Sequence, residues 1–365
     1  MASTRTKKLG PYDVGPEIGR GGMGEVLKAR HRLLERDVAL KRLHADHSQD
    51  PEELKERFLR EGRALAQLRH HNVVAVYDLF ERRGELYLAM ELVDGVDLAT
   101  LLREGALPID VACIIGIEVA AALEAAHRMG IVHRDIKAGN VMMSRDGAIK
   151  LMDFGIARQA EIEGVTRTGL VMGTPRYLAP ELLQGQDADP RSDVYGLGAL
   201  LYHCVSGRRL YEEATPENLF HLIHSGRYRP VRTVAPSAPR ALRRLIEACL
   251  HRKPDKRLQS PSALRQGLEG LMSDRGGWAN HAERVVGFLA ARGRISTEEA
   301  SQWVDASDLI MTSTFTESSS PGRRFLGALL MILFLVMAGA GAAAYLGLLD
   351  PSSLLPADSP SLPWF

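Results

Sequence analysis

Three polar side chains, Asp135, Lys137 and Asn140, lie close together between two apolar runs of the chain. Phosphoryl transfer to a hydroxyl group needs an acceptor for the hydroxyl proton, a cation near the transferring group and an oxygen ligand for Mg²⁺. A carboxylate, an ammonium group and an amide can supply these three. Loops usually carry function, so this spacing predicts a phosphoryl-transfer site, with a chance polar loop as the alternative.

The octet from His133 to Asn140 reads H-R-D-I-K-A-G-N and matches the pattern H-R-D-x-x-x-x-N. It resembles the catalytic loop of the eukaryotic-type (Hanks-type) serine/threonine protein kinases, a group also found in bacteria. The resemblance implies that Asp135 is the base, that Lys137 is the cation and that Thr174 bridges them. Lys137 and the Gly-Thr-Pro triplet at 173–175 favour serine and threonine over tyrosine as acceptors. Ala138 is a departure, because proline is common there.

A glycine-rich stretch, G-R-G-G-M-G-E-V, runs from Gly19 to Val26. Glycines let the backbone approach a phosphate and point N–H groups at it. A dinucleotide-binding turn shares this pattern, but there a helix should follow, whereas here β-type residues lead to V-A-L-K at Lys41. By resemblance the nucleotide-binding residues are Ile18, Gly19, Arg20, Gly21, Gly22, Met23, Gly24, Glu25, Val26, Ala39, Lys41, Glu91, Val93 and Met142.

The triplet D-F-G begins at Asp153. In the family this aspartate and the catalytic-loop asparagine, here Asn140, hold the metal ion between the phosphates. The implied cofactors are ATP and Mg²⁺, or Mn²⁺ in its place. Glu61 lies in a helical stripe predicted for Pro51 to Leu68, and the resemblance implies that it holds Lys41. A plain surface charge is the alternative for Glu61.

The segment from Asp153 to Glu181 ends in A-P-E and resembles a kinase activation segment. Thr166 and Thr168 form a T-x-T pair similar to the autophosphorylation site of bacterial kinases. Arg134 and Arg158 occupy the positions that receive such a phosphate, so phosphorylation is expected to order the segment and raise activity. Two solvated threonines are the alternative.

The resemblance implies structural roles for three further residues: Asp193 would brace the catalytic loop, and Glu181 would pair with Arg257. The expected fold class is α+β, a two-lobed kinase fold. Its small lobe, residues 12–92, has a five-stranded sheet and one helix, and its large lobe, residues 94–271, is mainly helical. Ser192 is a plausible N-cap for the helix that follows it.

Outside residues 12–271 the resemblance offers no guide. Residues 1–11 form a basic N-terminal tail without the apolar core of a signal peptide. Residues 272–324 are expected to contain helices, one near Trp278 to Arg292 and one with a capping box at Ser296 and Glu299. These helices could dock on the large lobe or form a spacer.

Residues 325–349 carry no charge over 25 residues. As a helix they would span about 37 Å, against a bilayer core of about 30 Å, so a single transmembrane helix is predicted, with a buried core helix as the alternative. Arg323 and Arg324 precede it and no Lys or Arg follows, which places the kinase domain in the cytoplasm of a bacterial cell, at the inner membrane. Residues 350–365 are then a short external tail. Small residues at Gly339 and Ala343 could pair two such helices in a homodimer.

The 46 basic and 45 acidic residues are almost balanced, which argues against nucleic acid as the main partner. The resemblance implies protein substrates as partners, and the helix predicted for residues 325–349 implies membrane lipid. The three cysteines show no metal-binding spacing and are expected to be reduced core residues. Two rivals remain: a catalytically silent scaffold, and a phosphotransferase that acts on small molecules. A scaffold should lack one of the motif residues, and a small-molecule enzyme should lack the activation segment.

Overall fold

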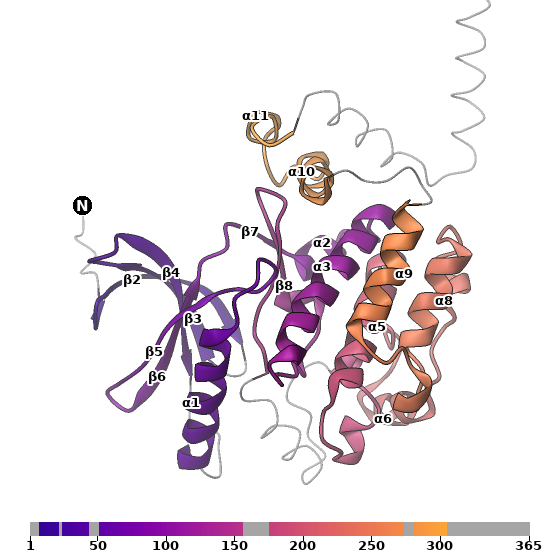
Figure 1. The fold of residues 1–365 in the computed structure, drawn as a ribbon, viewed down its shortest axis with the longest axis horizontal. Coiled ribbons are helices and arrows are strands. Elements are labelled where there is room, and N and C mark those ends of the chain that lie inside the picture. Colours follow the sequence, from indigo (N-terminus) through magenta and orange to yellow (C-terminus); the bar gives the residue numbers. More distant parts are fainter. Residues whose placement is uncertain (1–6, 22–23, 44–50, 156–174, 274–279, 305–365) are drawn as a thin grey trace, which may run out of the picture. The chain divides into compact units, whose positions relative to one another are not determined.

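The computed structural model describes residues 7–21, 24–43, 51–155, 175–273 and 280–304. They form a small lobe built on an antiparallel sheet and a larger, mainly helical lobe (Figure 1). The chain divides into two compact units, Met1–Thr312 and Ser313–Phe365. The whole second unit, with the predicted membrane helix, lies outside the described residues. In the described part, no helix is both long and apolar enough to cross a membrane.

The small lobe is a six-stranded antiparallel sheet with the strand order β1-β2-β3-β4-β6-β5. Tyr12, Val14, Ala29, Val38 and Leu40 form a buried cluster on this sheet. The strands are β1 (Lys7–Leu9), β2 (Tyr12–Gly21), β3 (Gly24–His31), β4 (Arg36–Leu43), β5 (Val76–Arg82) and β6 (Glu85–Glu91).

The five strands predicted within residues 12–92 are present as β2 to β6, but the sheet has a sixth strand, β1, in the residues assigned to the N-terminal tail. Three residues are too short to show an alternating pattern, so the strand is defined by its pairing. Leu9 pairs with Tyr12 and Lys7 with Val14. Gly10 turns the chain with φ +58°, a conformation that glycine adopts without steric cost.

Helix α1 (Pro51–Gln67) covers one face of this sheet and contacts β5. Its apolar stripe is buried at Phe58 and Leu65, as the periodicity predicted. Gly62 lies against Leu79 so closely that a β-carbon would come within 2.8 Å of that side chain. The close contact between Gly62 and Leu79 therefore sets the distance of α1, and with it of Glu61, from the sheet.

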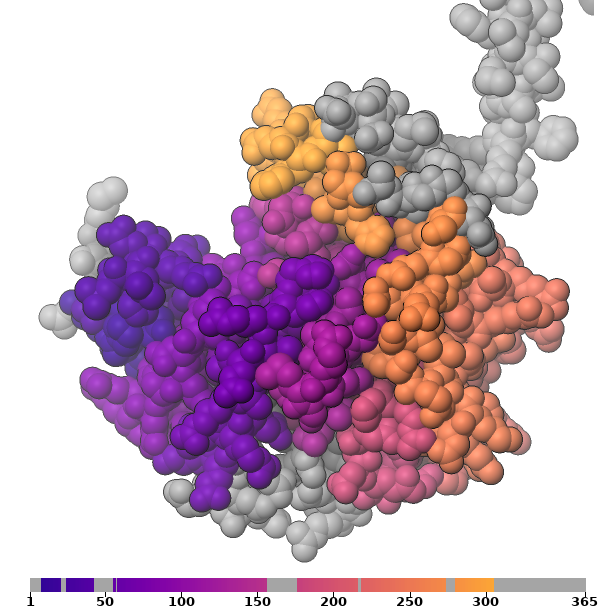
Figure 2. Space-filling view, in the orientation of Figure 1, coloured from indigo at the N-terminus to yellow at the C-terminus, as the bar shows by residue number. Residues whose placement is uncertain are grey.

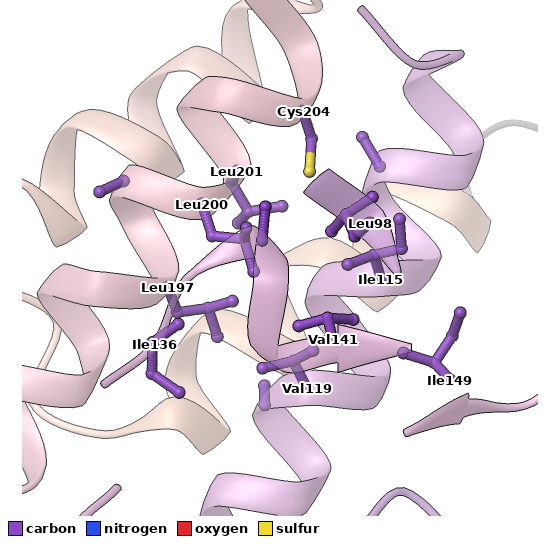
Figure 3. Close-up of a cluster of buried hydrophobic side chains, with 14 of the residues drawn as sticks. Leu98, Ile115, Val119, Ile136, Val141, Ile149, Leu197, Leu200, Leu201 and Cys204 are labelled. Atoms are coloured by element: carbon purple, nitrogen blue, oxygen red, sulfur yellow. The ribbon is translucent and has the colours of Figure 1, made fainter. Parts of the chain in front are cut away.

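The large lobe is organised around two nearly fully buried helices, α3 (Ile109–Arg128) and α5 (Pro190–Ser206). Figure 3 shows their contact, where Ile115 and Val119 meet Leu197 and Leu201 in one apolar cluster. The other elements are β7 (Gly95–Asp97), α2 (Leu98–Leu102), β8 (Val141–Ser144), β9 (Ile149–Leu151), α6 (Pro216–Ser225), α7 (Val231–Val234), α8 (Arg240–Cys249) and α9 (Pro261–Ser273), with short 3-10 turns at Ala138–Asn140, Pro175–Tyr177, Leu182–Gln184 and Pro254–Lys256.

The N-cap predicted for helix α5 was wrong. Asp189, not Ser192, caps the helix, and its side chain accepts a hydrogen bond from Arg191 N. Ser192 lies three residues on and completes a capping box with Asp189. Pro190, at the first helical position, fits this start because the N–H it lacks has no partner inside a helix.

Two helices follow the large lobe: α10 (His281–Ala291) and α11 (Thr297–Ala300). Val285, Val286, Phe288 and Leu289 of α10 are buried and belong to the same apolar core as α3. The predicted capping box between Ser296 and Glu299 is present. Of the two alternatives for this region, the structure shows docking on the large lobe for residues 280–304.

Candidate active site

Asp135 lies in a short loop directly before β8, with its carboxylate held from two sides. Lys137 Nζ lies 2.7 Å from Asp135 Oδ2. Asn140 Nδ2 donates to the main-chain oxygen of Asp135 at 2.7 Å and to Oδ2 at 3.1 Å. The structure thus brings together the three residues from which the sequence predicted phosphoryl transfer. A carboxylate fixed in this way can accept a proton from a hydroxyl group placed beside it.

His133 and Asp193 fix the conformation of the loop that carries Asp135. Asp193 is 1% exposed and accepts from the main-chain N–H groups of His133 at 2.8 Å and Arg134 at 2.9 Å. His127 Nε2 contacts the same carboxylate at 2.8 Å. These bonds hold Arg134 at φ +66°, a conformation uncommon for a residue with a side chain.

The protonation of His133 follows from its surroundings. Burial lowers the pKa of His133 to about 4, so the ring is neutral near pH 7. Its Nδ1 accepts from Asp135 N at 3.2 Å. The proton must then be on Nε2, which donates to Met152 O at 3.1 Å. One neutral imidazole therefore links the Asp135 loop to the strand that leads to Asp153.

The second part of the site is an ion pair between Lys41 of β4 and Asp153, at 2.6 Å. Burial favours the neutral acid, but the charge and hydrogen bond of Lys41, together with the charge of Lys137, outweigh it and lower the pKa of Asp153. Met152 N donates to Asn140 O at 2.9 Å, so the two halves of the site are joined by the main chain. Asp153 has φ +56°, the second non-glycine residue of the site in this unusual conformation.

The expected ion pair between Lys41 and Glu61 stays a prediction. In this structure Lys41 contacts Asp153, and Glu61 contacts Arg134 Nη1 at 3.3 Å. Arg134 was expected to receive a phosphate from the activation segment. Glu61, expected to hold Lys41, and Arg134, expected to receive a phosphate, therefore contact each other in this structure.

The glycine-rich stretch lies on the hairpin β2–β3, with Gly21 opposite Gly24. Arg20 is paired with Glu17 and Glu25, and Ile18 is half exposed. Gly22 and Met23 lie outside the described residues.

An apolar cluster lies between this hairpin and the link to the large lobe. It contains Val26 and Ala39 of the sheet, with Val93 beyond β6. Apolar side chains of this kind commonly line sites for planar ligands such as adenine. The cluster also contains Val74, Met90, Leu92 and Met152. Val74 and Met152 were missed because ordinary apolar side chains carry no motif.

The remaining expected site residues either form structural contacts or lie outside the described residues. Glu181 and Arg257 form a buried pair with contacts of 2.6 and 2.5 Å, and Ser192 Oγ donates to Glu181 at 2.8 Å. Thr166, Thr168, Arg158 and Thr174 lie outside the described residues. Met142 lies on β8, part-buried, opposite Lys150 in the register with β9.

Two buried histidines make the free energy of unfolding depend on pH. Burial lowers the pKa of His203, as it does that of His133, to about 4. Between pH 6.5 and 4 the unfolded chain binds protons that the folded protein does not, so stability present above pH 6.5 is lost as the pH falls. Each histidine accounts for about 3 kcal/mol.

Replacing His203 with Asn should therefore flatten the curve of unfolding free energy against pH by about one proton over this window, in denaturant titrations of the two proteins. His224→Asn at an exposed position is the control. An unchanged curve for His203→Asn would contradict a neutral buried His203.

Comparison with known proteins agrees with this geometry. Residues 12–268 match the model of the family described as protein kinase domain. The chain is 40% identical over 272 residues to serine/threonine-protein kinase PksC of Streptomyces coelicolor, covering 70% of this chain and 48% of that protein. It is 38% identical over 274 residues to serine/threonine-protein kinase PknA of Mycobacterium tuberculosis, covering 73% and 62%.

A solved structure, the kinase domain of Mycobacterium tuberculosis PknI, is similar with a TM-score of 0.60 and 28% identity, over 74% of this chain and 99% of that one. The chain spans about half the length of the curated relatives that it matches. The family match covers more than half of the chain, and it coincides with the lobes that carry Lys41, Asp135 and Asp153. The chain therefore belongs to the protein kinase family, and residues 12–268 form a serine/threonine protein kinase domain.

Proposed function

We propose that this protein transfers the γ-phosphoryl group of ATP to serine and threonine hydroxyls of proteins, with Asp135 as the base. The hydroxyl oxygen bonds to the γ-phosphorus, the bond to the β–γ bridging oxygen breaks, ADP leaves, and the hydroxyl proton passes to Asp135. The observation that carries the proposal is the Asp135–Lys137–Asn140 cluster joined through Met152 to the Lys41–Asp153 pair. A silent scaffold would need none of these contacts.

The side chains present fit a hard divalent cation such as Mg²⁺. Asn140 uses its Nδ2 for Asp135, so its amide oxygen could serve as a metal ligand, and the lowered pKa of Asp153 keeps that carboxylate ionised. Bound Mg²⁺ would neutralise charge on the β- and γ-phosphates. Among the residues described, no group of three or more His, Cys, Asp or Glu side chains could hold a metal. Phosphate oxygens and water commonly supply the remaining Mg²⁺ ligands.

The experiment that tests the proposal is transfer of labelled phosphate from ATP by the purified protein, with phosphorylated sites identified by mass spectrometry. Label on serine or threonine of a general protein substrate supports it. ATP binding without transfer, for the full chain in lipid as well as in detergent, would favour the scaffold. Transfer only to small molecules would favour the other rival.

Autophosphorylation of Thr166 or Thr168 is proposed as the activating step. The support is Arg134, which at present contacts Glu61 and is 25% exposed at its side chain. A phosphate carries about −1.5 to −2 charges and would compete with Glu61 for Arg134. Glu61 could then pair with Lys41. The double variant Thr166→Ala/Thr168→Ala should lose most of the rate increase that preincubation with ATP gives the parent protein. Full activation of the double variant would contradict the proposal.

Membrane anchoring through residues 325–349 is also proposed, on the evidence of 25 uncharged residues preceded by two arginines. It implies a single-pass protein of a bacterial inner membrane with its kinase domain in the cytoplasm, and a homodimer if the helices pair. Retention of the full chain in the membrane fraction after alkaline washing, and release after deletion of residues 325–349, would support it. Release of the full chain by the wash would exclude a spanning helix.

A further inference from the structure

The hairpin β8–β9 contacts the link between the lobes, residues 91–94, at both ends. At the first end, Lys150 Nζ of β9 lies 2.8 Å from Glu91 Oε1 and 3.1 Å from Oε2. Both side chains are largely buried, at 18% and 24% exposed. Glu91 Oε2 also accepts from Ala75 N at 3.1 Å. The carboxylate of Glu91 therefore contacts β9 of the large lobe and the residue just before β5 in the small lobe.

At the other end of the link, Asp94 is held by the turn of the same hairpin. Arg145 N donates to Asp94 O at 3.0 Å, and Ser144 Oγ donates to the same oxygen at 3.2 Å. The Arg145 side chain reaches Asp94 Oδ1 through Nε at 3.1 Å. Met142 pairs with Lys150 in the register of β8 and β9. The hairpin thus places Met142, an expected nucleotide-binding residue, between its contacts with Glu91 and with Asp94.

The turn that joins β8 to β9 contacts residues 280–304, which lie beyond the matched family domain. Arg145 Nη1 contacts Glu299 Oε1 of α11 at 2.7 Å. At Gly147, φ +85°, a β-carbon would come within 2.2 Å of Ala282 O of α10, so the two backbones touch. In Figure 2 the orange and yellow atoms of this segment lie directly on the purple and magenta part of the domain.

Segment 280–304 is itself anchored well enough to act as a support. Arg284 of α10 pairs with Asp110 at the start of α3, and these side chains are 9% and 13% exposed. His281 Nδ1 contacts Glu118 Oε1 at 2.6 Å, and Arg292 contacts Glu104 at 3.0 Å. The contacts of Arg284 and His281 join α10 to α3, and the contact of Arg292 joins its end to the residues between α2 and α3.

We propose that Lys150 and Arg145 are positioning residues for ATP, which hold residues 91–94 in the shape that binds adenine, and that helices α10 and α11 support Arg145 in this role. The inference rests on the proposed use of ATP. It makes segment 280–304 a working part of the catalytic unit, not a spacer. Because the contacts concern the nucleotide and not the acceptor hydroxyl, their loss should raise the Kd and KM for ATP and leave kcat nearly unchanged.

Titration with a fluorescent ATP analogue and steady-state kinetics on the full chain test this proposal. Lys150→Met should raise the Kd for the nucleotide about three- to tenfold, and Arg145→Ala about two- to fivefold, as expected for part-buried and surface ion pairs. kcat should stay within about twofold. The conservative variant Lys150→Arg, which keeps a cation beside Glu91, should retain most of the affinity, whereas a purely structural defect would not depend on that charge.

The support by α11 is tested by a double-mutant cycle. Glu299→Gln removes the charge that Arg145 contacts but keeps a residue that completes the capping box. It should raise the Kd about twofold in the parent and leave it unchanged in Arg145→Ala. Arg229→Ala, which breaks a surface ion pair of 2.8 Å with Glu213, is the matched control.

Unchanged nucleotide affinity in both Lys150→Met and Arg145→Ala, in a protein that binds ATP, would overturn the inference. A fall in kcat as large as the rise in the KM for ATP, together with a lowered melting temperature, would also overturn it. Failure of the proposed function gives a different result, because the parent would then bind nucleotide and show the predicted affinity changes but transfer no phosphate. A parent that binds no ATP overturns both.

Discussion

Replacing Asp135 with Asn is expected to lower kcat by about 10²- to 10⁴-fold, the range for loss of a general base. The amide has nearly the same shape and still accepts a hydrogen bond from Lys137, but it cannot take up the hydroxyl proton. The KM for ATP should stay within about twofold, since the apolar cluster of the nucleotide site comes from other segments. Steady-state transfer to a protein substrate measures both constants.

Asp187→Asn is the control for this prediction, because Asp187 is exposed and its replacement removes the same charge. It should leave kcat unchanged. A kcat within tenfold of the parent for Asp135→Asn would mean that Asp135 is not the base. A large rise in the KM for ATP would instead mean that the substitution disturbs the contact between the catalytic loop and Asp153.

Replacing Arg257 with Met is expected to lower the free energy of unfolding by about 3–5 kcal/mol. The Arg257 side chain is fully buried and Glu181 is 7% exposed, so the substitution leaves a buried carboxylate without its cation. Arg257 also donates to the main-chain oxygens of His251 and Arg191, which would lose those bonds. Urea titration followed by circular dichroism measures the change.

The double variant Glu181→Met/Arg257→Met separates the charge from the packing. Since two apolar groups of similar volume often replace a buried pair at little cost, it should recover most of the lost stability. Arg229→Met, at an exposed ion pair, should cost less than about 1 kcal/mol. A double variant as unstable as Arg257→Met alone would show that the main-chain hydrogen bonds of Arg257, and not its charge, stabilise this part of the lobe.

Local patterns predicted the elements that carry the site. The stripe that predicted a helix from Pro51 to Leu68 corresponds to α1, Pro51–Gln67. The Asp146-Gly147 pair, a common hairpin-turn sequence, joins β8 to β9. The loop from His133 to Asn140 could be found from sequence because its three chemical groups lie within a few residues. Strand β1 and the cap at Asp189 were missed, since a three-residue strand is defined by its partner and several polar residues near Pro190 could cap a helix.

The sequence by itself determined which groups are available for chemistry, because each motif is a short run whose members stay together in any fold. Only the tertiary structure decided which of these groups meet. Lys41 and Asp153 are 112 residues apart, and Arg134 and Glu61 are 73 apart; their contacts depend on how the lobes pack. Arg145 and Glu299, 154 residues apart, are ordinary surface charges in the sequence. They form a link between α11 and the turn of the hairpin β8–β9 because α10 buries its apolar face on the large lobe, and no local pattern says where such a face will dock.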